Sequence, residues 1–197
     1  MQKAASTSAA SITTTVKVAK ADVVVIATGS KPKLFSLEAE VHSAADVLLG
    51  KCSVGRNVVM IGGGLVGCET ALYLRKKGSN VTIVEALDKI LEVNGPLCHA
   101  NKEMLTALIL YKGVRTLTGS KATAYDGQTL TVYKTKDGKE EFPADTVVLA
   151  VGYTSINALY DTLKNEIPDI HLIGDARKVS NIMYAIWDAY ELASHID

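Results

Sequence analysis

Four short apolar runs have the pattern of strands that are buried on both faces. They lie at residues 21–29 (ADVVVIATG), 57–61 (NVVMI), 80–85 (NVTIVE) and 144–152 (ADTVVLAVG). A continuous apolar run, in place of a strict alternation with polar residues, is typical of strands in a parallel sheet. A further run, PDIHLIGDA, predicts a strand that ends in a turn. The pattern therefore predicts an α/β chain built on parallel strands.

Helical periodicity appears in three segments, at residues 65–77, 96–112 and 181–197. Pro96 suits the first position of a helix, and Gly78 and Gly113 suit the positions just after one. The segment 30–54 is expected to be a connector with at most a short helix near 44–49. The residues expected on buried helix faces are Ala100, Met104, Leu105, Leu108 and Ile109 in the second segment, and Ile182, Ala185, Ile186, Ala189, Ala193 and Ile196 in the third.

Three short strands are expected around 121–125, 129–133 and 139–142, with turns at Asp126-Gly127 and Asp137-Gly138. A meander of this kind would replace a helix as the crossover between parallel strands. The fold class predicted is thus α/β, a Rossmann-like βαβ unit with a three-stranded β-meander crossover.

Composition excludes several functional classes. The 21 Lys and Arg residues equal the 21 Asp and Glu residues in number, whereas a general nucleic-acid binder would show a basic excess. No apolar run approaches the roughly 18 residues that a membrane span requires. Three cysteines without C-x-x-C spacing suit a reducing compartment, and we expect a cytoplasmic protein.

The first twenty residues allow two interpretations. They contain no Asp or Glu and are rich in Ala, Ser and Thr, as a transit peptide would be. They also contain no Arg, and the alternation in SITTTVKV favours a short, half-exposed strand after a ragged terminus.

The strongest motif is G-x-G-x-x-G, formed by Gly62, Gly64 and Gly67 between a predicted strand and a predicted helix. The glycines permit a tight turn, a close backbone approach to a pyrophosphate and close helix–strand packing, and the helix start attracts phosphate. Leu65 and Val66 begin that helix and are expected contacts. The alternative interpretation is a merely tight turn. Glu85 ends the next strand, 18 residues after Gly67, where it can accept hydrogen bonds from an adenine ribose.

The same acid favours NAD(H) over NADP(H), because a carboxylate repels a 2′-phosphate and residues 86–92 offer only Lys89 to bind one. Glu69 is expected just inside the first helical turn, either as a solvent-facing acid or on the nicotinamide side. Asp175 alone suggests an Asx-turn or a cap. The four histidines have no metal-ligand spacing, so no metal is predicted.

Taken together, four segments resemble the flavin-dependent pyridine-nucleotide oxidoreductases that have two dinucleotide-binding domains. These segments are ADVVVIATGS, VVMIGGGLVGCETALYLRKKGSNVTIVE, ADTVVLAVGYTSIN and IHLIGDA with its following helix. The resemblance implies an NAD(H)-binding domain at 53–146, inserted between the parts 1–52 and 147–197 of a partial FAD-binding domain. It further implies that Gly152 lies at the NAD site, and that the FAD contacts are Thr28, Gly29, Gly174, Asp175, Asn181 and Ile182.

The chain departs from that family in lacking an earlier G-x-G-x-x-G for FAD, so we interpret it as a C-terminal fragment. Its ending resembles 2,4-dienoyl-CoA reductases and 2-enoate reductases, which implies an FMN barrel and an iron–sulfur cluster upstream. The expected function is electron input from NAD(P)H to FAD and on to FMN, with upstream flavin domains as partners. The fragment itself is expected to be inactive and able to self-associate. The alternative is a nucleotide-binding module without chemistry; a small disulfide reductase is disfavoured by the absent C-x-x-C.

Overall fold

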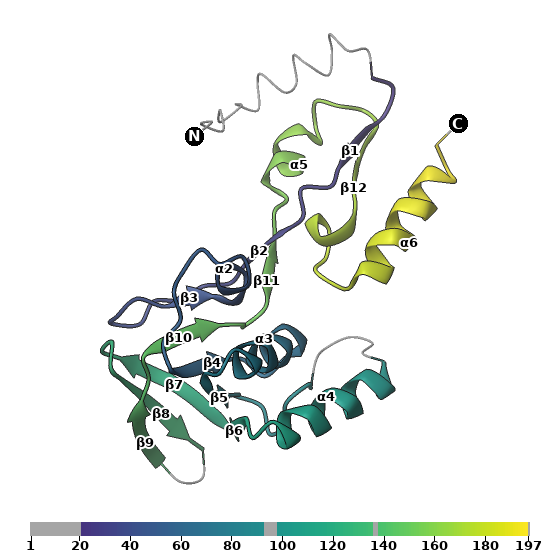
Figure 1. Ribbon diagram of the computed structural model, residues 1–197. Coiled ribbons are helices and arrows are strands. Elements are labelled where there is room, and N and C mark those ends of the chain that lie inside the picture. Colours follow the sequence, from purple (N-terminus) through teal and green to yellow (C-terminus); the bar gives the residue numbers. More distant parts are fainter. Residues whose placement is uncertain (1–20, 93–97, 136–137, 197) are drawn as a thin grey trace. The chain divides into compact units, whose positions relative to one another are not determined.

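The computed structural model describes residues 21–92, 98–135 and 138–196 (Figure 1). The chain forms two compact units. Among the described residues, one contains 21–31 together with 153–196, and the other lies within Pro32–Gly152. The described part of the predicted nucleotide-binding segment, 53–146, lies in the second unit, which also includes 32–52 and 147–152. The expectations for residues 1–20, for Pro96 and for Asp137 fall outside the described residues.

The second unit is built on a five-stranded sheet whose paired strands all run parallel. The strand order is β3 (His42–Ser43), β10 (Thr146–Leu149), β4 (Asn57–Ile61), β5 (Asn80–Val84) and β6 (Arg115–Leu117). The glycine motif follows the central strand β4, with β10 and β5 as its neighbours.

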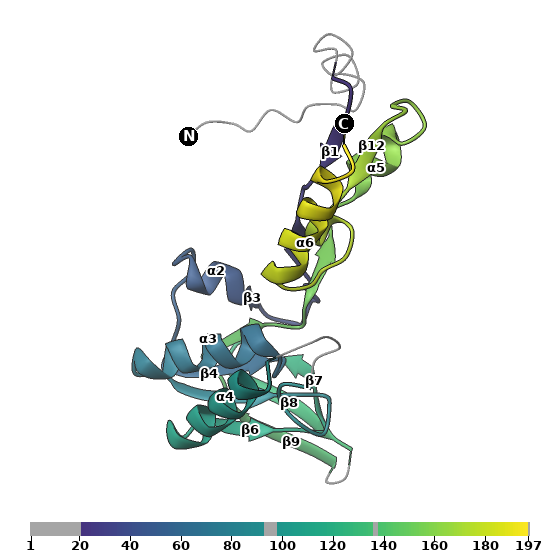
Figure 2. The same cartoon turned by 90° about the vertical axis from the view of Figure 1, so that its right-hand side faces the viewer.

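Alternate residues of β4 serve two separate cores, because successive side chains of a strand point to opposite faces. Val58 and Met60 pack on the side of α2 (Ala44–Leu48), α3 (Leu65–Lys76) and α4 (His99–Tyr111). Val59 and Ile61 pack on the other side. That side is covered by the antiparallel meander β7 (Ser120–Tyr125), β8 (Thr129–Lys134) and β9 (Gly138–Pro143) (Figure 2). The predicted α/β class, with its parallel sheet and meander crossover, is confirmed.

Two expectations for this unit are corrected. The segment 30–54 is more than a connector, because β3 joins the sheet. The short helix expected near 44–49 is present as α2, which Ser43 caps by accepting a hydrogen bond from the Asp46 amide at 3.0 Å. Helix α4 buries Leu105 and Ile109 as predicted, but Met104 is 54% exposed. The reason is that only a narrow stripe of α4 is covered by the core.

In its described residues the first unit contains two helices and one strand pair, and a second pair reaches its boundary with the other unit at Pro32. Strand β1 (Val24–Ile26) pairs in parallel with β12 (Ile170–Leu172), and β2 (Ser30–Pro32) pairs with β11 (Tyr153–Ser155). Helix α5 (Ala158–Leu163) and strand β11 were not predicted. A 3-10 turn, η1 (Gly174–Ala176), leads to α6 (Ile182–Ala193).

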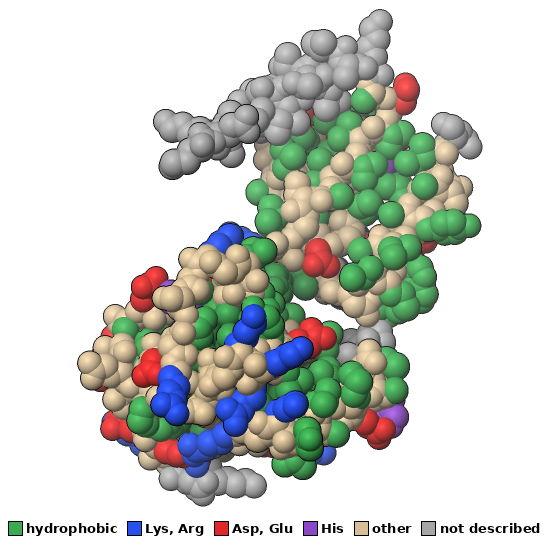
Figure 3. Space-filling view, in the orientation of Figure 1, with side chains coloured by type: hydrophobic (Ala, Val, Ile, Leu, Met, Phe, Trp, Pro, Cys, Tyr) green, Lys and Arg blue, Asp and Glu red, His purple; other side chains and the backbone are tan. Residues whose placement is uncertain are grey.

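The burial expected in the first unit is wrong. The run 21–29 was predicted to be a strand buried on both faces, but β1 is three residues long and Val25 is 43% exposed. Among the described strands β12 is its only neighbour, so little covers it. Helix α6 has no buried residue, and Ile182, on its predicted inner face, is 79% exposed. Hydrophobic side chains accordingly gather on the visible surface over α6 (Figure 3).

No helix in the described part of the chain has both the length and the apolar character needed to cross a membrane.

Candidate dinucleotide-binding site

The turn after β4 can be made only with glycine at two positions. Gly62 has φ +106°, and a Cβ there would lie 2.4 Å from the carbonyl oxygen of Ala150 at the end of β10. A Cβ on Gly67 would lie 1.9 Å from the carbonyl oxygen of Gly62. Since real Cβ contacts do not approach so closely, these glycines allow α3 to pack directly onto the sheet. This is the geometry that the sequence motif predicts.

Helix α3 begins with unused hydrogen-bond donors. Gly64 is its N-cap and provides no side chain to cap the helix. The first intrahelical bond runs from the Cys68 amide to the Gly64 carbonyl, at 2.9 Å. The amides of Leu65, Val66 and Gly67 precede it and have no acceptor within the helix. These three N–H groups and the positive end of the helix dipole form a site for an anion such as a phosphate.

The Glu85 carboxylate lies beside the same turn. Its Oε2 accepts a hydrogen bond from the Gly63 amide at 2.6 Å, and its Oε1 accepts one from the Leu87 amide at 2.8 Å. Each carboxylate oxygen has two lone pairs, so both can accept further hydrogen bonds from hydroxyl groups. The structure thus brings the glycine turn, the start of α3 and Glu85 together at the carboxyl ends of β4 and β5.

Two other predicted contacts lie near the turn in sequence. Glu69 is the fifth residue of α3 and is exposed. Its predicted place just inside the first turn is wrong, because the helix begins at Leu65. Gly152 follows β10 with φ +95°, and its carbonyl accepts a hydrogen bond from the Lys33 amide at 2.9 Å. The roles of Glu69 and Gly152 toward a nucleotide stay predictions.

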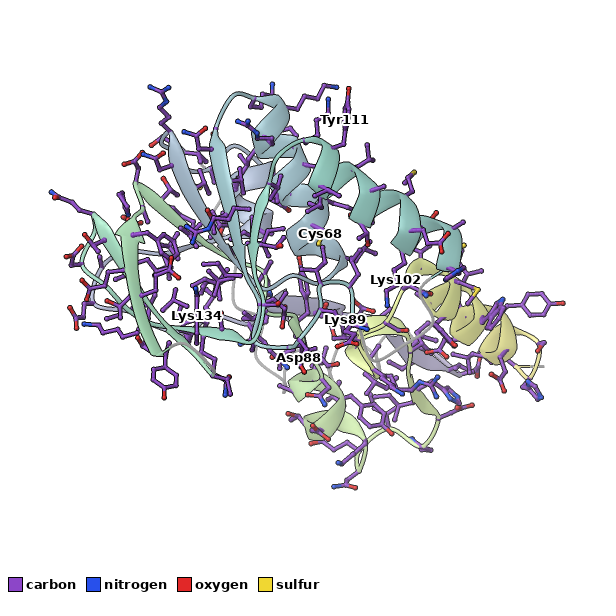
Figure 4. All side chains as sticks on the ribbon, turned by 90° about the horizontal axis from the view of Figure 1, so that it is seen from below. Cys68, Asp88, Lys89, Lys102, Tyr111 and Lys134 are labelled. Carbon is purple, nitrogen blue, oxygen red and sulfur yellow. The ribbon has the colours of Figure 1, made fainter. Side chains whose placement is uncertain are left out.

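Cys68 is a core residue, as predicted. It is fully buried, and its Sγ donates to the Gly63 carbonyl at 3.4 Å. Burial, and then the negative charges of Glu85 and Glu69, raise its pKa to about 12, so the thiol stays protonated. In Figure 4 the Cys68 side chain lies among the packed side chains beside α3, whereas Tyr111 points outward. Within the described ranges, no group of three or more His, Cys, Asp or Glu residues could hold a metal ion.

The predicted FAD contacts come together at one end of the β1–β12 pair. Thr28 and Gly29 follow β1, and Gly174 and Asp175 follow β12, its parallel neighbour. The Asp175 carboxylate joins two segments: Oδ2 accepts from the Ser30 hydroxyl at 2.9 Å, and Oδ1 accepts from the Ser180 amide at 3.1 Å. Asp175 therefore holds a wider loop than the Asx-turn that the sequence alone suggested.

The start of α6 lies next to this loop in the sequence. Asn181 caps the helix, its Oδ1 accepting from the Tyr184 amide at 3.2 Å, and Ile182 is the first helical residue. The first backbone amides of α6 and the Asn181 side-chain Nδ2 are therefore donors that remain available to a ligand.

Sequence reasoning missed the residue that supports Gly174. Asp188 of α6 accepts hydrogen bonds from the Gly174 amide at 3.0 Å and from Arg177 Nε at 3.1 Å, and it also pairs with Arg177 Nη2. Its side chain is only 13% exposed. Asp188 in the middle of the largely apolar sequence IMYAIWDAYELA was the available signal, because a charge in such a helix needs a partner.

Comparison with known proteins identifies a family and several relatives that this chain resembles. The sequence pattern of the pyridine nucleotide-disulphide oxidoreductase family matches residues 3–189. Cinnamate reductase of Clostridium sporogenes is 48% identical over 181 residues, which are 89% of this chain and 27% of that protein. NADH oxidase of Thermoanaerobacter brockii is 39% identical over 186 residues, 89% of this chain and 28% of that protein. The solved complex of 2-naphthoyl-CoA reductase with 2-naphthoyl-CoA superposes with a TM-score of 0.83 at 28% identity, covering 93% of this chain and 28% of that one.

Proposed function

Because the chain belongs to the pyridine nucleotide-disulphide oxidoreductase family, we propose that it is the electron-input part of a flavin oxidoreductase. In this proposal the unit Pro32–Gly152 binds NAD(H), and the other unit contributes part of an FAD site. The observation that carries it is the turn after β4, where Gly62 and Gly67 leave no room for a side chain and unused α3 amides lie beside the Glu85 carboxylate.

Each part of the turn has a task toward a dinucleotide. The amides of Leu65, Val66 and Gly67 bind the pyrophosphate, and Gly62 and Gly64 let the backbone approach it. Glu85 accepts hydrogen bonds from the adenine ribose. Glu69 is assigned to the nicotinamide side, and Gly152 to the NAD(H) site.

The cofactor is proposed to be NAD(H) in preference to NADP(H). Two backbone amides hold the Glu85 carboxylate in place, so it cannot swing away from a 2′-phosphate without losing both hydrogen bonds. In the described segment 86–92 Lys89 is the only cation. Asp88 immediately precedes it in the sequence, which reduces the net positive charge that a 2′-phosphate would meet.

The first unit fits only part of an FAD molecule. Asp175 and the Gly174 turn offer acceptors for ribityl hydroxyls, and the first amides of α6 offer donors to the flavin side. Thr28 and Gly29 line the neighbouring strand end. Within the residues that the structure describes, there is no second G-x-G-x-x-G turn for the FAD pyrophosphate. When both cofactors are bound, the nicotinamide supplies a hydride and the flavin accepts it.

The relatives suggest where the electrons go. The chain spans 27–28% of the length of the relatives named above. We propose that the whole protein has an FMN domain and an iron–sulfur cluster upstream of this chain, and that it passes electrons from FAD to FMN for the reduction of an enoate or dienoyl-CoA type substrate. A cytoplasmic location belongs to the same proposal.

The test is a titration of the purified chain with NADH and with NADPH, in which binding is measured by calorimetry or by the fluorescence of the nucleotide. NADH is expected to bind more tightly than NADPH. The Glu85→Ala variant should bind NADH about 10–100-fold more weakly, because it loses charge-assisted hydrogen bonds. Glu92→Ala, an exposed acid seven residues further along, is the matched control and should leave both affinities unchanged.

Equal affinity of the wild-type chain for NADPH and NADH would contradict the proposed selectivity, and no binding of either would contradict the proposed site. Addition of FAD separates electron input from the alternative, a nucleotide-binding module without chemistry. Bleaching of flavin absorbance by NADH in the full-length protein supports electron input.

A further inference from the structure

Gly63 occupies a position that the G-x-G-x-x-G motif leaves open to any residue. In this structure a Cβ at that position would lie 2.8 Å from Ile90 Cγ2, 3.2 Å from Glu85 Cβ and 3.3 Å from Glu85 Oε2. Ile90 Cγ2 is a methyl group on a branched Cβ, which has little freedom to rotate away. Position 63 is therefore restricted to glycine by two side chains that lie 22 and 27 residues further along the chain.

Both backbone groups of Gly63 are hydrogen-bonded to that same later segment. Its amide donates to Glu85 Oε2 at 2.6 Å, and its carbonyl accepts from the Leu91 amide at 2.7 Å. Leu91 is 2% exposed and has φ +59°, a left-handed conformation that is uncommon for a branched residue. The burial of its side chain in the core holds this conformation in place. Gly63 is thus clamped between Glu85 and Leu91.

The clamp fixes one carboxylate oxygen of Glu85 from the side of the glycine turn. The Leu87 amide fixes the other oxygen at 2.8 Å. The direction of the carboxylate therefore depends on the backbone at Gly63 as much as on Glu85 itself. A side chain at position 63 would push directly on Glu85 Cβ and Oε2.

We propose that Gly63 is a positioning residue that fixes the Glu85 carboxylate and thereby sets the preference for NADH over NADPH. The inference rests on the proposed function of this turn in binding NAD(H). It adds that selectivity depends on a residue that forms no part of the three-glycine motif. Gly63 acts through Glu85.

The first experiment measures Kd for NADH and for NADPH in the wild type, Gly63→Ala, Glu92→Ala and the double variant Gly63→Ala with Ile90→Ala. Gly63→Ala is expected to lower the NADH affinity about tenfold and to reduce the ratio between the two affinities, because Glu85 is displaced. The double variant removes the 2.8 Å contact and should restore part of the ratio. Glu92→Ala should leave the ratio unchanged. If Gly63→Ala weakens NADH and NADPH by the same factor, the residue merely shapes the turn and the proposal is overturned.

The second experiment needs no nucleotide. Hydrogen exchange of the Gly63 amide, followed by NMR in the free protein, should be at least about tenfold faster in Glu85→Ala than in the wild type. Thermal unfolding of each variant confirms that the comparison is made on folded protein. A wild-type chain that fails to bind NADH, but whose Gly63 amide is protected by Glu85, would overturn the proposed function and leave the clamp standing. An exchange rate that is indifferent to Glu85 would overturn the clamp.

Discussion

Replacing Gly67 by alanine should destabilise the protein, although alanine is normally the better helix residue. Gly67 is the third residue of α3, and an alanine in place of glycine within a helix usually stabilises by about 0.5–1 kcal/mol. Here the added Cβ would lie 1.9 Å from the Gly62 carbonyl oxygen and 3.3 Å from Ala150 Cβ. The nearest atom belongs to the backbone, so no side-chain rotation can relieve the contact.

The size of the effect follows from these two opposing contributions. Overpacking in a tightly packed site costs about 1–3 kcal/mol, and a backbone obstacle places this position at the upper end of that range. After subtraction of the helix-propensity gain, the expected loss is about 2 kcal/mol. A loss of that size lowers Tm by about 4–8 °C in a protein of this length. The NADH affinity should fall as well, because the start of α3 must move away from the glycine turn.

Thermal and urea unfolding, followed by circular dichroism, measure this loss. Lys76→Ala is the control within the same helix, since Lys76 is exposed and its replacement should change stability by no more than about 0.5 kcal/mol. A Gly67→Ala protein with an unchanged or higher Tm would refute the reasoning, because it would show that α3 does not pack on Gly62 as closely as 1.9 Å implies.

Two further outcomes are expected. Hydrogen bonds from Lys134, and to a smaller extent from Arg115, hold the pKa of Glu140 below its ordinary value of 4.5. The stability that these bonds provide is therefore present above pH 4.5 and is lost as the pH falls through the folded-state pKa. Glu140→Gln should therefore lower the free energy of unfolding by about 0.2–1 kcal/mol at pH 7. In unfolding measurements at successively lower pH below 4.5, the difference between the variant and the wild type should shrink. A difference that grows on acidification would contradict this. The purified 197-residue chain should be colourless and oxidise NADH little, because Asp175 and the start of α6 supply only part of an FAD site; stoichiometric flavin absorbance would show that the pyrophosphate is held by residues not assigned to it.

Several features that the sequence predicted correctly have signals between neighbours in the chain. The turn from β4 to α3 and the three strands of the meander have their own local signals. At Asp126 the predicted turn is held by its Oδ1, which accepts from the Gln128 amide at 2.8 Å and from the Thr129 amide at 2.7 Å. Such signals act over a few residues and need no knowledge of the tertiary fold.

The failures concern surfaces whose burial depends on distant parts of the chain. An apolar stripe on α6 predicts an inner face, yet Ile186 is 60% exposed in the described structure. The run containing β1 likewise predicts a strand with two covered faces, and Val25 is 43% exposed. Periodicity indicates which side of an element is apolar, but it does not supply the neighbour that would cover that side.

The two units share one hydrogen-bond arrangement at a strand end. In each unit a carboxylate from a later element accepts a hydrogen bond from a glycine amide at a strand end: Glu85 from Gly63, and Asp188 from Gly174. A negative charge beside these amides disfavours the binding of a phosphate to them. In the proposed function the donors left for the NAD(H) pyrophosphate are the first amides of α3, and the first amides of α6 are left for the flavin. In the proposed NAD(H) site, the Glu85 carboxylate as acceptor for ribose hydroxyls and the α3 amides as donors to phosphate are thereby held at separate, fixed places.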